Sequence, residues 1–326
     1  MKKRILSGMR PTGKLHLGHL VGALDNWIKL QDEYECFFMV ADWHALMSEY
    51  ADPKDLQENI LDNVIDWLSF GISPKKSTIF IQSHVKEHLE LYMILSMIAP
   101  LGLLERCPTY KEQLREITNR DLSTYGFLGY PVLQAADILL YKAEAVPVGE
   151  DQLPHLELTR QIVRKFNNLY KKDFFPEPKA LLTQAQRLLG LDGRKMSKSY
   201  NNYIALSEKP DSLRKKVSNM FTDPTRIKFS DPGHPQDCNV HNYYAVFAPE
   251  RKKEVDELCR KAKVGCTDCK KELAEILIRF LEPIQQKRNE LLKDKNRVFD
   301  ILEDGEKKAG KAAAETMSEV KKPLNL

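Results

Sequence analysis

Two short stretches of this sequence carry side chains suited to binding a polyphosphate. The first, residues 11–19, follows a strand-like run and leads into a helical pattern. The first N–H groups of a helix lack partners within the helix, and the helix dipole favours anions, so such a turn suits a phosphate. His16 and His19 lie three residues apart and can face one phosphate, while Gly18 permits close approach because it has no Cβ. Taken alone, the stretch is equally consistent with an ordinary turn carrying two surface histidines.

The second stretch, residues 195–199, reads Lys-Met-Ser-Lys-Ser and follows a glycine-containing turn. Lys195 and Lys198 are flanked by hydroxyls and can wrap a pyrophosphate. Bound there, they would stabilise the charge that develops as the bond at an α-phosphate breaks. A solvated lysine loop is the common alternative, but it is less favoured because the same chain carries the Gly/His turn. We expect the two stretches to meet across one bound polyphosphate.

The elements that must position these residues alternate between strands and helices. Apolar runs at residues 36–40 and 78–81 predict buried parallel strands, and helical patterns separate them, so residues 4 to about 185 predict a doubly wound parallel α/β sheet. Asp42 and His44 follow one strand, at the edge where open α/β sheets bind ligands. The polar stretch 110–124 predicts a loop, and the apolar stretch 89–104 predicts one helix that is buried or forms a subunit interface.

Beyond residue 190 the strand patterns stop. Helices are expected at 212–220, 253–261, 269–293 and 298–320. We therefore predict two domains: a catalytic domain over 1–190, and a region over 191–326 that holds the lysine loop and a separate α-helical domain.

The composition is that of a globular protein with a mild positive charge. Of 326 residues, 42% are hydrophobic and 29% charged, with a formal net charge of +4, which permits binding to a polyanion without requiring it. No apolar run reaches the roughly 18–20 residues that span a bilayer, and the basic start has no signal-peptide core. The sequence thus predicts a cytoplasmic protein without a membrane segment, in which a disulfide framework is not expected.

Four cysteines form a cluster with metal-site spacing. Cys238, Cys259, Cys266 and Cys269 follow the pattern C-x20-C-x6-C-x2-C. Four thiolates suit either tetrahedral zinc or a four-iron cluster, and ligand softness does not separate the two. Four unrelated reduced thiols are the less favoured alternative. Nearby lysines would let this region contact RNA phosphates; they are Lys261, Lys263, Lys270 and Lys271.

Residues 11–19 and 195–199, on a doubly wound sheet, resemble the HIGH and KMSKS signatures of class I aminoacyl-tRNA synthetases. The first is degenerate, with Leu17 where isoleucine is common, and the second is intact. Segments 134–141 and 146–152 are more specific, and with them nearly the whole chain resembles bacterial tryptophanyl-tRNA synthetases. The resemblance implies a Rossmann-like catalytic domain, an α-helical anticodon-binding domain and a homodimer.

The resemblance also implies the reaction. Tryptophan and ATP, with Mg²⁺ on the phosphates, would form tryptophanyl-adenylate and pyrophosphate. Tryptophan would then pass to the 3′ end of tRNA(Trp), releasing AMP. Positioning and charge stabilisation carry such chemistry, and no protein nucleophile is required.

Site residues carry over from the family by position. Those expected to act in catalysis are Arg10, His16, His19, Lys195 and Lys198. Those expected to bind ATP are Arg10, Pro11, Thr12, Gly18, His19, Gly149, Glu150, Asp151, Leu188, Lys195, Met196, Ser197, Lys198 and Ser199. Those expected around tryptophan are Leu6, Ser7, His44, Tyr130, Gln134, Asp137, Val146, Val148 and Gln152. Among them, Asp137 would accept the indole N–H, which can only donate.

Three positions depart from commoner members of the family: Arg10 replaces Gln, Leu6 replaces Phe and Gln134 replaces Met. Tyrosyl enzymes often combine Tyr, Gln and Asp at spacing like that of Tyr130, Gln134 and Asp137, so a tyrosine–tRNA ligase remains the alternative. A nucleotidyltransferase without tRNA and a non-catalytic nucleic-acid or iron–sulfur module are less favoured. Some tryptophanyl enzymes carry a [4Fe–4S] cluster on a similar cysteine pattern with a slightly longer first interval, so zinc also stays open.

Overall fold

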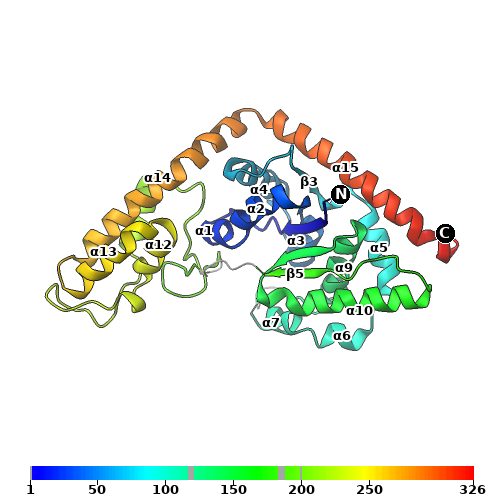
Figure 1. Cartoon of the computed structure of the whole chain (residues 1–326), viewed down its shortest axis with the longest axis horizontal. Coiled ribbons are helices and arrows are strands. Elements are labelled where there is room, and N and C mark those ends of the chain that lie inside the picture. Colours follow the sequence, from blue (N-terminus) through cyan, green and yellow to red (C-terminus); the bar gives the residue numbers. More distant parts are fainter. Residues whose placement is uncertain (1, 117–120, 183–187, 199) are drawn as a thin grey trace. The chain divides into compact units, whose positions relative to one another are not determined.

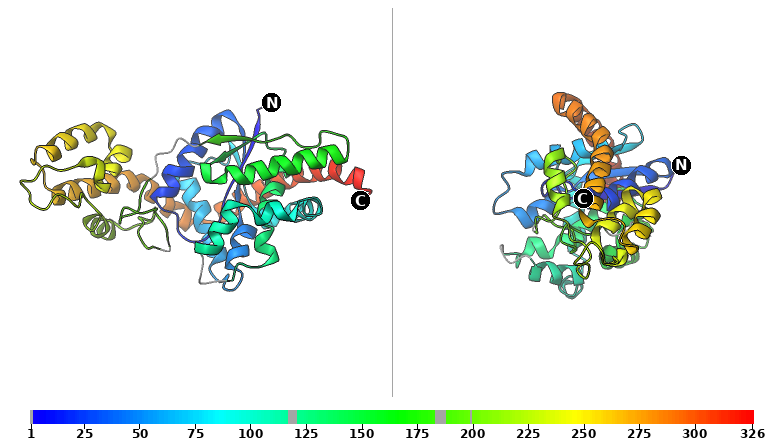
Figure 2. Two further views of the ribbon diagram at one scale, coloured as in Figure 1. Left: turned by 90° about the horizontal axis from the view of Figure 1, so that it is seen from below. Right: turned by 90° about the vertical axis from the view of Figure 1, so that its left-hand side faces the viewer.

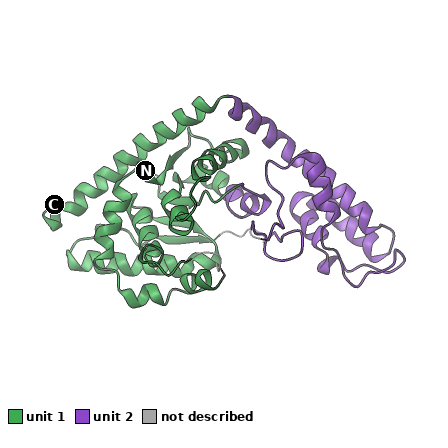
Figure 3. Cartoon of the chain, turned by 180° about the vertical axis from the view of Figure 1, so that it is seen from behind, with its two compact units in different colours: residues 1–13, 27–183, 294–326 green, residues 14–26, 184–293 purple. Residues whose placement is uncertain are grey.

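The computed structural model describes residues 2–116, 121–182, 188–198 and 200–326. The chain divides into two compact units, which Figure 3 shows in different colours. Unit 1 comprises Met1–Gly13, Trp27–Thr183 and Asp294–Leu326, and unit 2 comprises Lys14–Asn26 and Gln184–Lys293. The chain therefore passes between the units several times, and the C-terminal helix counts with the first.

Unit 1 is built on a five-stranded sheet in the order β3-β2-β1-β4-β5. The strands are β1 (Arg4–Met9), β2 (Glu35–Val40), β3 (Ser77–Ile81), β4 (Ala145–Val148) and β5 (Lys179–Leu182). All neighbours pair in parallel, as in Ser7 opposite Phe38 and Ile5 opposite Ala145. The order reverses between β1 and β4, where open α/β sheets bind ligands. The predicted doubly wound sheet is confirmed.

Helices cover both sides of these strands (Figure 1). In unit 1 they are α3 (Asp42–Glu49), α4 (Leu56–Phe70), α5 (Glu87–Ser96), α6 (Leu101–Glu105), α7 (Pro108–Glu116), α8 (Tyr125–Leu128), α9 (Tyr130–Leu140), α10 (Leu153–Leu169) and α15 (Lys295–Lys321). The core follows from the sequence: residues 36–40 of β2 are all buried, and Trp27 stacks on Phe38 with ring centroids 4.4 Å apart. Helix α9 is buried along nearly its whole length.

Two expectations for this unit were wrong. The stretch 89–104 is not one helix, because α5 ends at Ser96 and α6 begins at Leu101, immediately after Pro100. Proline lacks the N–H that would continue the hydrogen-bond ladder. The stretch 110–124 is not a loop throughout, since α7 extends to Glu116. Its helix has Pro108 in the first turn, and its polarity hid it from a search for apolar periodicity.

Helix α15 packs directly on the edge strand β3. A Cβ at Gly305 would overlap the carbonyl oxygen of Ile79, so only glycine allows the helix to come this close. Lys321 further along the helix pairs with Glu90 of α5 at 2.6 Å. Figure 2 shows the C-terminal half of α15, in red, lying against unit 1.

The regular secondary structure described in unit 2 is helical apart from two isolated bridges, and loops connect its helices. Its elements are α1 (Leu17–His19), the π-helical turn η1 (Leu20–Leu24), α11 (Pro210–Ser218), α12 (Asn239–Phe247), α13 (Pro249–Arg260) and α14 (Cys266–Lys293). The helix that leaves the 11–19 turn thus opens as α1 and η1 and continues as α2 (Asp25–Glu33), through which the division between the units passes. Helix α12 had no counterpart among the expected helices. Among the described residues, no helix is long and apolar enough to cross a membrane.

Candidate functional site

The carboxylate of Asp137, on α9, is the centre of a buried hydrogen-bond network in unit 1. His44 Nε2 lies 2.7 Å from Oδ2, and Gln82 Nε2 donates to Oδ1 at 2.8 Å. His88 Nδ1 lies 2.6 Å from the same Oδ1. Burial by itself would raise the pKa of Asp137, but hydrogen bonds from His44 and His88 outweigh it and lower the pKa to about 2. Asp137 is therefore an anion that can only accept hydrogen bonds.

A second network in unit 1 joins Tyr130 and Gln152 through His155. His155 Nε2 lies 2.7 Å from the Tyr130 hydroxyl and 2.8 Å from Thr109 Oγ1, and its Nδ1 lies 2.9 Å from Gln152 Oε1. Burial lowers the pKa of His155 to about 4, so the ring is neutral at pH 7. Its Nδ1–H then donates to Gln152 Oε1, and the single lone pair of Nε2 accepts from the nearer hydroxyl, that of Tyr130. With its proton directed at His155, the Tyr130 oxygen is left as an acceptor.

The remaining residues predicted around tryptophan have more varied surroundings. Val146 and Val148 lie on β4 and share one buried cluster with Leu6 of β1. Ser7 Oγ accepts a hydrogen bond from Trp27 Nε1 at 3.1 Å. Gln134 is half-buried one turn before Asp137, and among the described residues it makes no hydrogen bond to either network.

The unit 1 residues predicted to bind ATP follow the carboxyl ends of β1 and β4. Arg10, just after β1, is exposed and has Glu49 and Tyr130 near enough to interact with its charge, while Pro11 is buried and Thr12 half-buried. Gly149, Glu150 and Asp151 follow β4. A Cβ at Gly149 would lie 2.6 Å from Asp151 Oδ1, so the turn needs glycine there.

His16 and His19 cap the short helix α1 in unit 2. Gly18 N–H donates to His16 Nδ1 at 3.2 Å, and His16 N–H donates to His19 Nδ1 at 3.3 Å. Burial, followed by the charge of Lys198, lowers the pKa of His16 to about 4, and burial likewise lowers that of His19. Both rings are therefore neutral at pH 7. Because each Nδ1 accepts, the proton of each ring is on Nε2, where it can be donated to a phosphate oxygen.

The lysine loop lies beside this turn, within the same unit. A Cβ at Gly18 would be 3.2 Å from Met196 Sδ, and Lys198 is near enough to lower the pKa of both histidines. Lys195 is exposed, Ser197 is half-buried and Leu188 is buried. Ser199 lies outside the described residues. The expected proximity of the two stretches is therefore found for residues 16–19 and 196–198.

Asn202 holds the lysine loop in shape. Its Oδ1 accepts from Ser197 N–H at 2.8 Å, and its Nδ2 donates to Asp192 Oδ1 at 2.7 Å and to the Lys195 carbonyl at 3.0 Å. A Cβ at Gly190 would overlap the Asn202 side chain, so only glycine lets the backbone at residue 190 pass this close to Asn202. Helix α12 supports the other side, because Asn239 Nδ2 donates to the Gly190 carbonyl at 2.7 Å.

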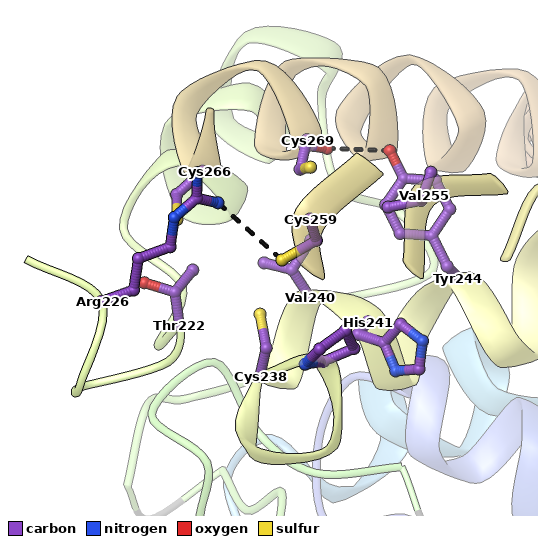
Figure 4. Close-up of a pocket in the computed structure, with 11 residues that line it drawn as sticks. Thr222, Arg226, Cys238, Val240, His241, Tyr244, Val255, Cys259, Cys266 and Cys269 are labelled. Carbon is purple, nitrogen blue, oxygen red and sulfur yellow. Dashed lines mark hydrogen bonds between the residues drawn. The ribbon is translucent and has the colours of Figure 1, made fainter. Parts of the chain in front are cut away.

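The four predicted metal ligands line one cavity of about 30 Å³ in unit 2. Cys238 directly precedes α12, Cys259 lies in the last turn of α13, and Cys266 and Cys269 lie in the first turn of α14 (Figure 4). The rest of the wall combines apolar side chains with Thr222, Arg226 and His241. Arg226 Nη1 lies 3.8 Å from Cys259 Sγ, and a Cβ at Gly233 would overlap that sulfur. Without a cation in the cavity, burial raises the pKa of Cys269 to about 12 and raises those of Cys238 and Cys259.

The cavity fits a thiolate-bound centre in its chemistry. Four thiols from three segments converge there, and backbone N–H groups of Asp223, Val240 and His241 point at Cys238. Among the described residues, no group of three or more His, Cys, Asp or Glu side chains is arranged to hold a metal ion as it stands. The metal site therefore stays a prediction.

Several residues of these networks carried no sequence signal that singled them out. They are Gln82, His88, Thr109, His155 and Asn202. None belongs to a recognised motif. For His88 and His155 the available signal was a histidine on an otherwise apolar helix face, and such a residue is more often an ordinary buried histidine.

Comparison with known proteins agrees with this geometry. The family model described as tRNA synthetases class I (W and Y) matches residues 1–282. The chain is 54% identical over 326 residues to a tryptophan–tRNA ligase of Thermotoga maritima, covering 99% of both proteins, and 44% identical to one of Aquifex aeolicus, covering 99% of this chain and 100% of the relative. A crystal structure of tryptophanyl-tRNA synthetase from Campylobacter jejuni complexed with ADP and tryptophan matches with TM-score 0.90 and 36% identity over 99% of this chain and 100% of that one.

Proposed function

The chain belongs to the class I tRNA synthetases of the tryptophan and tyrosine family, and from this premise we propose that it is a tryptophan–tRNA ligase. It activates tryptophan with ATP to tryptophanyl-adenylate and pyrophosphate, and then transfers tryptophan to tRNA(Trp), releasing AMP. The observation that carries the proposal is the 54% identity with a tryptophan–tRNA ligase over 99% of both chains. It favours tryptophan over tyrosine, which the family alone leaves open.

The amino acid is held by the two networks of unit 1. Asp137 accepts the indole N–H, and Val146, Val148 and Leu6 supply apolar walls for the ring. The Tyr130 oxygen, whose proton is directed at His155, accepts from the α-ammonium together with Gln152. Each polar end of tryptophan thus meets a group of matching hydrogen-bond type in a buried environment, where mismatch is costly. Ser7, His44 and Gln134 complete the proposed surroundings.

ATP is held through its phosphates by neutral donors and lysines. His16 and His19 donate from Nε2, Gly18 lets the nucleotide approach the backbone, and Lys195 and Lys198 stabilise the charge that accumulates on the departing pyrophosphate. Mg²⁺ would accompany ATP and neutralise phosphate charge. The other proposed nucleotide contacts are Arg10, Pro11, Thr12, Gly149, Glu150, Asp151, Leu188, Met196, Ser197 and Ser199. The division into a catalytic part over 1–190 and a tRNA-binding part over 191–326 stays a proposal about function.

Amino-acid-dependent exchange of ³²P between pyrophosphate and ATP tests the proposal. Purified protein should catalyse exchange with tryptophan and should charge tRNA(Trp). Exchange with tyrosine in place of tryptophan would overturn the choice of substrate. Absence of exchange with both amino acids would overturn the enzymatic assignment itself.

For the four-cysteine cavity we propose a [4Fe–4S] cluster, with zinc as the alternative. The support is the convergence of Cys238, Cys259, Cys266 and Cys269 on one cavity and the N–H groups aimed at Cys238. A centre bound there would staple the loop before α12 to α13 and α14, and Arg226 beside Cys259 would offset part of its negative charge. Protein purified without oxygen should be brown and contain iron and acid-labile sulfide. A colourless protein with one zinc per chain would select the alternative, and metal-free protein would overturn both.

An exposed loop beside this cavity is the proposed contact for the tRNA anticodon. Residues 226–229 alternate between cations and apolar side chains, and Ile227 and Phe229 are 87% and 64% exposed. The loop is nevertheless ordered by hydrogen bonds, because Arg226 Nη2 donates to the Phe229 carbonyl at 2.9 Å and Lys228 N–H donates to Asp231 Oδ2 at 2.7 Å. An exposed aromatic side chain that follows Lys228 and lies near Arg226 suits stacking on an unpaired base, with the two cations contacting phosphates.

The Phe229→Ala variant tests this contact. It should raise the KM for tRNA and leave tryptophan-dependent exchange unchanged. Phe299→Ala is the matched control, because Phe299 is also an exposed phenylalanine but lies on α15 in unit 1. An unchanged KM for tRNA in Phe229→Ala would remove the loop from the interface.

We also propose that the protein is a cytoplasmic homodimer that pairs through α5. Leu89, Met93 and Met97 follow one another at intervals of four along this helix and its end, so they share a face, and Met93 and Met97 are 56% and 70% exposed. A stripe of large exposed apolar side chains marks an interaction surface. The double variant Met93→Glu/Met97→Glu should sediment as a monomer where the parent sediments as a dimer.

A further inference from the structure

Among the residues that the structure describes, none fills one of the hydrogen-bond positions of the Asp137 carboxylate. An ionised carboxylate offers about four in-plane acceptor positions, two on each oxygen. Oδ1 accepts from Gln82 Nε2 at 2.8 Å and from His88 Nδ1 at 2.6 Å. Oδ2 has His44 Nε2 at 2.7 Å. The fourth position, on Oδ2, is the one left for a ligand.

The hydrogen bond from His88 to Asp137 is supported by Tyr141 on the other side of the His88 ring. His88 Nε2 lies 2.8 Å from the hydroxyl of Tyr141, and both side chains are 0% exposed. Because the carboxylate can only accept, the proton on Nδ1 of His88 must point at Asp137. Nε2 lies within hydrogen-bond distance of the Tyr141 hydroxyl, and this contact holds the ring in its orientation.

Aromatic packing holds this chain in place. The ring of Tyr141 stacks on Phe37 with centroids 4.6 Å apart and lies 5.4 Å from Phe80. Phe80 in turn lies 6.0 Å from His88. The chain Tyr141–His88–Asp137 therefore starts in the core beside the sheet and ends at the ligand-facing carboxylate, and it links α5 to α9 through side chains.

We propose that Tyr141 and His88 are positioning residues for the aromatic ring of the amino acid. They hold the Asp137 carboxylate in one rotation and keep Oδ1 occupied, so that the free position on Oδ2 faces the substrate and selects a ring that carries an N–H donor. The inference rests on the proposed tryptophan substrate and goes beyond it, because neither residue is assigned to contact tryptophan.

The expected effect arises because tryptophan binds less tightly when the Asp137 carboxylate is not held in the orientation that accepts the indole N–H. With His88 removed, Oδ1 loses a charge-assisted bond and the carboxylate can turn that oxygen toward the ligand, so its geometry is no longer fixed. With only the Tyr141 hydroxyl removed, Nε2 is left buried without its hydrogen-bond partner, and the His88 ring loses the contact that fixes its orientation toward Asp137. Groups that orient a ligating side chain in this way typically change affinity or activity on the order of 10- to 100-fold.

The test compares tryptophan with β-(3-benzothienyl)alanine, in which sulfur replaces the indole N–H at nearly unchanged ring size. Pyrophosphate exchange gives kcat/KM for both amino acids and the KM for ATP. The variants are Tyr141→Phe, His88→Leu and His88→Asn, in which the Asn amide can replace the Nδ1 donor. Phe38→Leu serves as control, because it removes a buried aromatic ring that stacks on Trp27 and makes no bond to Asp137.

In the parent, tryptophan should be preferred over the sulfur analogue. Tyr141→Phe and His88→Leu should lower that preference on the order of tenfold or more, with the KM for ATP unchanged, and His88→Asn should restore part of it. Phe38→Leu should lower the melting temperature without changing the preference. An unchanged preference in a folded Tyr141→Phe variant, or an equal loss for both amino acids, would overturn the positioning role. Lack of tryptophan-dependent exchange in the parent would instead overturn the proposed function.

Discussion

In the proposed ATP site, His16 and His19 are hydrogen-bond donors and not cations. His16 and His19 each accept a backbone N–H at Nδ1, and burial lowers the pKa of His16 to about 4. A protonated ring would have to break its Nδ1 bond. The positive charge for the phosphates therefore comes from Lys195 and Lys198, and the histidines supply directed Nε2–H groups that need no change of protonation between pH 6 and 8.

This arrangement predicts a pH-dependent stability. The pKa of His16 is about 4 in the folded protein and about 6.5 when unfolded, so the unfolded chain takes up a proton first as the pH falls. The contribution of neutral His16 to the free energy of unfolding is complete above pH 6.5 and is lost as the pH falls from about 6.5 to 4. In His16→Asn, the Asn oxygen can accept from Gly18 N–H without titrating. Urea unfolding at pH 7 and at pH 4.5 measures how far the free energy of unfolding falls between them. This fall should be smaller by about 1–2 kcal/mol in His16→Asn than in the parent. An equal loss in both proteins would contradict the assignment.

Residues at strand ends were predictable from sequence, and residues that support them from elsewhere were not. His44 follows β2, and Gln152 follows β4, so the rule about carboxyl ends of parallel strands finds them. His88 and His155 reach the same networks from the first turns of α5 and α10, where the sequence shows only a histidine on an apolar helix face. Their role depends on which helices lie side by side, and that is decided by tertiary packing.

At the scale of elements, the lysine loop depends on one amide for its shape. Asn202 bonds the backbone at Ser197 and Lys195 and the side chain of Asp192. In Asn202→Ala these bonds are lost and the two lysines are no longer held in one conformation. Exchange should fall on the order of tenfold or more through kcat and the KM for ATP, with the KM for tryptophan nearly unchanged. Ser218→Ala, on the exposed face of α11, is the control, and normal exchange by Asn202→Ala would show that the loop is ordered by other contacts.

The contact of α15 with the sheet edge depends on Gly305. A Cβ there would overlap the Ile79 carbonyl, so Gly305→Ala must push the helix off β3 and should lower the free energy of unfolding by about 2 kcal/mol or more. Gly310→Ala is a matched control in the same helix, because a Cβ there meets nothing within 4 Å. It should raise stability by about 0.5–1 kcal/mol, since alanine favours the helix. Urea unfolding of the two variants measures both effects, and equal stability would mean that α15 does not pack through this glycine.

Elements were predictable where one periodicity dominates. The continuous apolar run at 36–40 predicts a buried strand, and all of its residues are buried. The same holds for β3, in which only Thr78 is half-buried. Helix α7 was missed because its charged residues show no apolar stripe. Helix α12 was missed because it is short and rich in Val, Tyr and Phe, which have low helix propensity.

At the scale of the whole molecule, the order of residues along the chain does not follow the compact units. Residues 294–326 form the last part of the sequence, yet they count with unit 1, because α15 packs on β3 through a contact that no local pattern announces. The turn at 14–26 counts with unit 2, together with the lysine loop that it adjoins. A boundary at one point of the sequence would therefore separate residues 294–326 from unit 1 and residues 14–26 from unit 2, although long-range packing joins them.

The two halves of the reaction should respond differently to loss of the cysteine cavity. In the proposed mechanism, adenylate formation depends on the Asp137 and His155 networks and on the turn at residues 16–19, none of which shares a residue with the cavity wall. Charging also needs the tRNA, which we place at residues 226–229 beside Cys259. Cys266→Ser should therefore lose the bound metal and charge tRNA on the order of tenfold more slowly, with tryptophan-dependent exchange unchanged. Thr267→Ala, at the exposed neighbouring position, should behave like the parent in all three measurements. Normal charging by metal-free Cys266→Ser would remove the centre from tRNA recognition, and parallel loss of exchange would make it a requirement for folding instead.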